Sequence, residues 1–161
     1  MADKAAKQPI LVPVDFSEAS EAALLKAFEL AECLKVRVVV LHVVHDPGDM
    51  PGYYSAMVKK KKFGRMQDAA RVMLEDFILE FRKKYNTKQR LKRAERMLVI
   101  GLPVTRILQV AKKIDASFVV MGSKGETGIK HLMLGSVAER VVQLCPLPVM
   151  VVKVAPQEEA S

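Results

Sequence analysis

Five short apolar segments, most of them rich in valine and isoleucine, recur along the chain at 10–14, 36–41, 96–100, 118–121 and 149–152. None alternates cleanly between apolar and polar residues. Continuous β-branched runs of this length are typical of strands buried on both faces of a sheet. The segment at 96–100 also contains arginine and lies next to glutamate, which favours a place at the sheet edge.

Between these segments, apolar residues recur at spacings of three and four, which predicts helices with one buried face over 17–34, 64–85, 104–114 and 136–144. Asp15 and Glu18 form a candidate capping box, Pro103 is placed to open the third helix, and Pro146 and Pro148 stop the last one. The face predicted to be buried in the second helix consists of Met66, Ala70, Met73, Leu74, Phe77, Ile78, Phe81 and Tyr85.

The resulting alternation of strand and helix predicts an α/β fold, in which a five-stranded parallel sheet carries helices on both faces and is joined by right-handed crossovers. Such sheets bind ligands at the carboxyl ends of their strands, where the strand order reverses. We expect one domain at 10–154, flexible ends at 1–9 and 155–161, and a long surface loop at 46–64 that includes the turn-rich DPGDMPG run.

Composition narrows the class of protein. The chain has 161 residues, 50% of them hydrophobic, which suits a single domain with a substantial core. No apolar run approaches the roughly 20 residues that span a bilayer, and the amino terminus lacks the apolar region of a secretory signal. We therefore expect a cytoplasmic protein that is not integral to a membrane. Cys33 and Cys145 are expected to be reduced and buried in helices.

The net charge of +8 is concentrated in one segment, 59–96, which has 14 basic and 5 acidic residues. The helical pattern within it is laid out for a core, and acidic residues are interleaved among the basic ones. We favour a solvated surface here. Binding of nucleic acid, an acidic partner, a phosphate-rich ligand or a membrane surface is the alternative.

A glycine pattern, G-x2-G-x9-G-S, follows the fourth predicted strand and leads into the last helix, at Gly122, Gly125, Gly135 and Ser136. Glycine lets backbone N–H groups approach an anion closely, and the start of a helix adds N–H donors and partial positive charge. Lys124 is placed to add a mobile positive charge. The pattern is typical of a phosphate-binding loop, although a glycine-rich connection that binds nothing also fits it.

These residues carry a resemblance to the universal stress protein family, in its ATP-binding branch. The glycine pattern matches the family's nucleotide motif without a gap. The run PVDFS at 13–17 is similar to the family's opening, LHVV at 41–44 to the end of its second strand, and PVMVVK at 148–153 to its last strand. The match spans roughly residues 10–153, apart from the crossover at 46–100, where these motifs offer no anchor. The resemblance implies a Rossmann-like sheet with strand order 3-2-1-4-5.

The resemblance also implies roles for individual residues. Asp15, preceded by Pro13 and Val14, would bind the adenosine part, and Val43 would hold adenine through its backbone. Met121 and Gly122 would line the approach of ribose and phosphate. Gly125, Gly135, Ser136 and Val137 would hold the phosphates. A helix N-cap is the alternative role for Asp15, and both roles are compatible.

No catalytic set and no metal site is predicted. Around the glycine loop only Glu126 and His131 are possible titrating partners, and three dispersed histidines do not form a metal centre. We expect ATP, ADP or AMP as the ligand, with any Mg²⁺ or Mn²⁺ carried on the phosphates. Hydrolysis should be slow at most, so the protein would act through nucleotide occupancy and an unidentified protein partner. A slow ATPase is the alternative.

The last predicted strand, Val149–Val152, is expected at a sheet edge. An exposed apolar edge invites pairing with another strand. Together with the family resemblance, this predicts a two-fold homodimer through the last strands.

Overall fold

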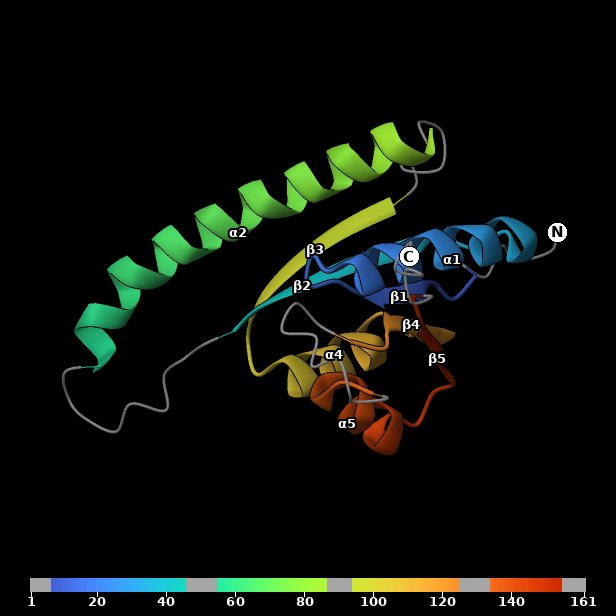
Figure 1. The fold of residues 1–161 in the computed structure, drawn as a ribbon. Helices are drawn as coiled ribbons and strands as arrows, with labels where there is room; N and C mark the ends of the chain where they lie inside the picture. Colours follow the sequence, from blue (N-terminus) through green and yellow to red (C-terminus); the bar gives the residue numbers. More distant parts are fainter. Residues whose placement is uncertain (1–6, 46–54, 87–93, 125–133, 155–161) are drawn as a thin grey trace, which may run out of the picture.

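The computed structural model describes residues 7–45, 55–86, 94–124 and 134–154. Within them, strands and helices alternate along the chain (Figure 1). The elements are β1 (Ile10–Pro13), α1 (Glu18–Leu34), β2 (Val38–His45), α2 (Ser55–Tyr85), β3 (Ala94–Gly101), α4 (Pro103–Lys113), β4 (Phe118–Gly122), α5 (Ser136–Leu144) and β5 (Val149–Val152).

The described strands form one parallel sheet in the order β3-β2-β1-β4-β5. This confirms the predicted sheet, its strand order and the edge positions of the third and fifth strands. The chain moves outward from β1 to β2 and β3, and then returns to the other side of β1 as β4. The strand order therefore reverses at β1, the place where the general rule for such sheets puts a ligand.

Helices cover both faces of the sheet, and the alternation of side chains along the strands explains how. Ile10 and Val12 of β1 point to one face and pack with residues of α1 and α2. Leu11 of β1 and Val39 of β2 point to the opposite face and pack with α4 and α5. Figure 1 shows α2 on one side of the sheet and the α4–α5 pair on the other. Strands buried on both faces need apolar residues at every position, which is why the segments show no alternation.

The second helix departs most from the prediction. It begins at Ser55, so the predicted surface loop at 46–64 is wrong for its second half, while residues 46–54 lie outside the described part. Most of the predicted inner face is confirmed, with Leu74, Ile78 and Phe81 buried in the core. The prediction is wrong for Met73, because this residue is 53% exposed. Its place in the helical repeat falls one position away from Leu74, outside the stripe that reaches the sheet.

Two smaller expectations are also corrected. The N-cap of α1 is Ser17, whose hydroxyl accepts from the backbone N–H of Ser20, so the predicted capping box of Asp15 and Glu18 is wrong. Both cysteines are free, but Cys33 lies exposed near the end of α1, and Cys145 is only half-buried just after α5. The expectation of burial fails for Cys33 because it lies on the outer face of its helix.

The glycine at the end of β4 has a packing role. A methyl group built on Gly122 would lie 2.6 Å from the carbonyl carbon of Ala19 and 2.8 Å from its Cβ, distances that real Cβ atoms essentially never show. Only glycine therefore lets the end of β4 approach the first turn of α1 this closely.

We predict that Gly122→Ala lowers the free energy of unfolding by about 1–3 kcal/mol, because the backbones of β4 and α1 must separate. Gly64→Ala in α2 is the matched control, since a Cβ there meets no atom within 4 Å. It should stabilise the protein by about 0.5–1 kcal/mol, because alanine is the better helix former. Urea unfolding followed by circular dichroism measures both changes. Equal stability of Gly122→Ala and the parent would contradict the packing role.

Candidate functional site

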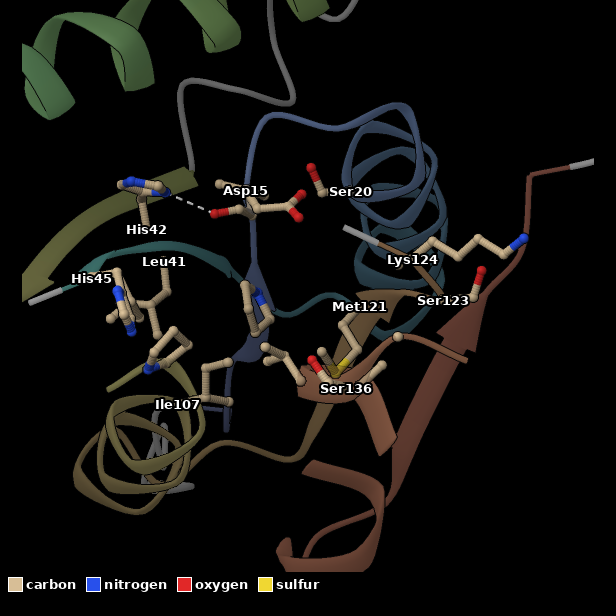
Figure 2. Close-up of a pocket in the computed structure, with 18 residues that line it drawn as sticks. Asp15, Ser20, Leu41, His42, His45, Ile107, Met121, Ser123, Lys124 and Ser136 are labelled. Atoms are coloured by element: carbon tan, nitrogen blue, oxygen red, sulfur yellow. Dashed lines mark hydrogen bonds between the residues drawn. The ribbon is translucent and has the colours of Figure 1, made fainter. Parts of the chain in front are cut away.

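A pocket of about 450 Å³ opens at the carboxyl ends of β1, β2 and β4, beside the start of α5 (Figure 2). Ten of the eleven predicted site residues line it, whereas Gly125 lies outside the described residues. The ten are Pro13, Val14, Asp15, Val43, Met121, Gly122, Lys124, Gly135, Ser136 and Val137. The structure thus brings together residues from distant parts of the chain, and their roles toward a ligand remain predictions.

Sequence reasoning missed several residues of the same wall. Leu41 and His42 precede Val43 on β2, and Ile107 reaches the pocket from α4. The signal for α4 was available, because this helix follows β3, whose carboxyl end lies at the same edge of the sheet. The other residues that were missed are Ser20, His45, Pro103, Ser123 and Ala138.

The carboxylate of Asp15 is held in the turn between β1 and α1. Its Oδ1 accepts hydrogen bonds from the backbone N–H of Ser17 at 3.2 Å and from the Ser17 hydroxyl at 2.5 Å. The hydroxyl in turn caps α1, so the carboxylate and the helix start are linked through one side chain. This arrangement fixes an acceptor group at the pocket wall, where it can receive hydrogen bonds from a ligand's hydroxyls.

The turn itself is strained at Phe16, whose φ of 69° lies in the left-handed region that bulky residues rarely adopt. Aromatic packing holds the residue in place. The Phe16 ring stacks on His42, with ring centroids 4.3 Å apart, and lies 5.5 Å from the ring of Phe77 on α2. The left-handed residue bends the chain away from the sheet immediately after Asp15.

His42 connects the ends of β1 and β2. Its Nδ1 lies 2.9 Å from the carbonyl oxygen of Val14, and a carbonyl only accepts, so Nδ1 carries a proton that it donates. Burial lowers the pKa of His42, while the bond to Val14 and the charge of Asp15 oppose that shift. The ring is therefore neutral at neutral pH, and its Nε2 carries a lone pair.

Two backbone hydrogen bonds hold the side of the pocket formed by the end of β4 and the start of α5. The N–H of Ser123 donates to the carbonyl of Val152 at 2.9 Å, and the N–H of Gly135 donates to the carbonyl of Ser123 at 2.6 Å. Gly135 is the N-cap residue of α5, so the first-turn N–H groups of Ser136 and Val137 begin at the pocket. A helix start of this kind favours an anion. Of the residues between Lys124 and Leu134, including Glu126 and His131, none lies in the described part.

The described residues provide neither a cluster of metal ligands nor a membrane-spanning helix. Among them, no three histidine, cysteine, aspartate or glutamate side chains gather to hold a metal ion. The described helices include none that is both long and apolar enough to cross a membrane.

The basic segment is largely balanced where it is described. Over 64–86, arginine and lysine alternate with acidic residues, and two of the basic residues form ion pairs: Lys83 with Glu80 at 2.7 Å and Lys84 with Glu21 at 2.6 Å. The remaining basic residues fall mainly at 59–62 and 88–93, whose side chains lie outside the described part. The described surface of α2 therefore resembles a solvated face more than a phosphate-binding stripe.

Comparison with known proteins identifies the family. A family model described as "Universal stress protein family" matches residues 7–153. Universal stress protein MJ0577 of Methanocaldococcus jannaschii is 30% identical, over 89% of this chain and 93% of that protein. A universal stress protein of Mycolicibacterium smegmatis is 34% identical over 90% of this chain, which spans only 45% of the length of that relative.

Solved structures show the same fold. The structure of MJ0577 superposes with a TM-score of 0.72, at 24% identity over 94% of this chain and 99% of that one. A universal stress protein in complex with cAMP gives a TM-score of 0.59, at 20% identity over 92% and 98%. One from Archaeoglobus fulgidus in complex with dAMP gives 0.56, at 24% identity over 92% and 99%. With a family model matched over nearly its whole length, this chain belongs to the universal stress protein family.

Proposed function

We propose that this protein binds an adenine nucleotide, ATP or its products ADP and AMP, in the pocket at the ends of β1, β2 and β4. The observation that carries the proposal is the convergence of ten predicted site residues on one pocket. They come from three strand ends and a helix start that are separated by up to about 120 residues along the chain.

Different parts of the pocket suit the base, the ribose and the phosphates of a nucleotide. The aliphatic side chains of Leu41, Val43 and Ile107 offer an apolar wall for a base. The Asp15 carboxylate can accept hydrogen bonds from ribose hydroxyls. Lys124 and the first turn of α5 supply positive charge and N–H donors for phosphates. The family members solved with cAMP and dAMP lend support, since both ligands contain adenine.

Binding and regulation fit this site better than fast catalysis. The described pocket residues with ionisable side chains are Asp15, His42, His45 and Lys124, and fast phosphoryl transfer needs a positioned nucleophile and stabilisation of charge at the transferred phosphate as well. Any Mg²⁺ or Mn²⁺ would arrive on the phosphates. We therefore infer that the protein acts in a stress response in the cytoplasm, by changing its protein partners with nucleotide occupancy.

Replacing Gly135 by valine should abolish nucleotide binding while leaving the protein folded. Its φ of −73° and ψ of 155° are values that valine adopts readily, so the expected loss arises from a side chain placed against the phosphates. The experiment compares three proteins: the parent, Gly135→Val and the control Gly64→Val. Each is purified and denatured in parallel, and the released small molecules are identified by mass spectrometry. Adenine nucleotide should appear with the parent and the control alone. Release of equal amounts of adenine nucleotide from Gly135→Val and the parent would show that the phosphates do not bind at this loop.

Replacing Asp15 by asparagine should weaken ATP binding by roughly 10- to 100-fold, because a charged acceptor of hydrogen bonds becomes a neutral one. Asparagine keeps an oxygen for the N–H of Ser17, so the turn should survive. Asp76→Asn, at an exposed position on α2, is the matched control and should bind like the parent. Isothermal titration calorimetry gives the three dissociation constants. A parent-like value for Asp15→Asn would show that this carboxylate serves the turn alone.

We also propose a homodimer through the edge strand β5. Carbonyls of Pro148 and Val152 accept from β4, so the intervening N–H of Val151 faces outward. Val151→Pro removes that donor and leaves the β4 ladder intact, as proline permits at an edge. Light scattering should give twice the chain mass for the parent and one chain mass for the variant. A parent that remains monomeric at working concentration would contradict the dimer.

A further inference from the structure

At the pocket, the backbone hydrogen-bond ladder between β1 and β2 lacks the next bond that would continue its register. The register runs from Ile10 opposite Val38 to Pro13 opposite Leu41, and the N–H of Val14 still donates to the carbonyl of Leu41 at 2.8 Å. In a parallel ladder the next bond would join the N–H of Val43 to the carbonyl of Val14. The register does not extend to a pair of Val14 and His42, so that bond is not made.

The His42 side chain binds the carbonyl oxygen of Val14 instead. Its Nδ1–H donates to the Val14 carbonyl at 2.9 Å, the bond drawn as a dashed line in Figure 2. The ring is held there by stacking on Phe16, whose left-handed backbone carries the chain out of the sheet. A side chain thus replaces the last backbone donor of the ladder.

This arrangement affects the backbone N–H and carbonyl of Val43. Successive peptide groups of a strand point to opposite sides, and the carbonyl of Leu41 points toward β1, so the N–H and carbonyl of Val43 point that way too. Beyond Val14 the described part of the chain has no strand on that side, and Val43 lines the pocket. One edge of adenine presents an acceptor beside a donor, the complement of a backbone N–H and carbonyl.

We propose that His42 is a positioning residue, which by binding the Val14 carbonyl keeps the backbone N–H of Val43 available to a nucleotide base. The proposal rests on the proposed function for its ligand, but its statement about the ligand-free protein stands by itself. Without the imidazole donor, the Val14 carbonyl would take the N–H of Val43, and the ladder would close over the base-binding edge.

The test combines amide hydrogen exchange with ATP titration in the full chain. In the ligand-free parent, the Val43 amide should exchange at least tenfold faster than the Leu41 amide, which points the same way but lies within the paired register. In His42→Phe, which keeps an aromatic ring and loses the donor, the Val43 amide should exchange more slowly than in the parent. General loss of stability would move it in the opposite direction. The dissociation constant for ATP should rise about tenfold or more.

His42→Asn is the rescue variant, because its amide places an N–H close to the position of imidazole Nδ1. It should return both the Val43 exchange rate and ATP affinity toward the parent values. Faster Val43 exchange in a folded His42→Phe protein, or ATP affinity equal to that of the parent, would overturn the proposal. If His42→Phe does not fold, His42→Leu, which also lacks the donor, takes its place in the same two measurements. A parent that binds no ATP, with its Val43 amide exchanging as expected, would refute the nucleotide function alone.

Discussion

Burial of the central strand on both faces is the constraint on which the rest of the structure depends. Ile10, Leu11 and Val12 are fully buried, so β1 needs helices above and below it and a neighbouring strand on each side. Right-handed crossovers satisfy this only if the chain first builds outward on one side of β1 and then returns to the other. Among the described residues, the reversal leaves the end of β1 uncovered by any crossover, and the pocket lies there.

The polar and strained residues of this region are consistent with that origin. Where β1 leaves the sheet, its last peptide groups have lost their ladder partners and need replacements. The His42 ring serves the carbonyl of Val14, and the hydrogen bonds of Ser17 and Asp15 form the start of α1. The left-handed Phe16 is the bend that makes these contacts possible, and its packing against Phe77 offsets the strain. Structural bonds at the turn therefore also set the positions of groups that a ligand would meet.

The sequence was sufficient to predict the order of elements and the sheet, because both depend on local composition and on rules of connection. It also selected residues that the fold then gathered at one pocket. The start of α2 was missed because the lysine run at 59–62 favours a helix by propensity but shows no apolar stripe. The cap of α1 was assigned to Asp15 because aspartate and serine are equally good caps, and only the backbone geometry of Ser17 separates them. His42 could not be found, since a side chain that bonds the backbone of a neighbouring strand leaves no trace in linear spacing.

The glycines of the motif do not share one cause, and this changes how the motif should be understood. Gly122 is required by its approach to Ala19, which depends on the packing of α1 and needs no ligand. Gly135 has an ordinary backbone conformation as the N-cap of α5, so its φ and ψ angles do not require glycine. The proposed phosphate contact would need a close approach to its backbone, which glycine allows. The motif thus combines a glycine that builds the sheet-to-helix contact with one for which we propose a role toward phosphate. Loss of binding on substitution is therefore evidence about phosphates at Gly135, whereas at Gly122 it reports first on the fold.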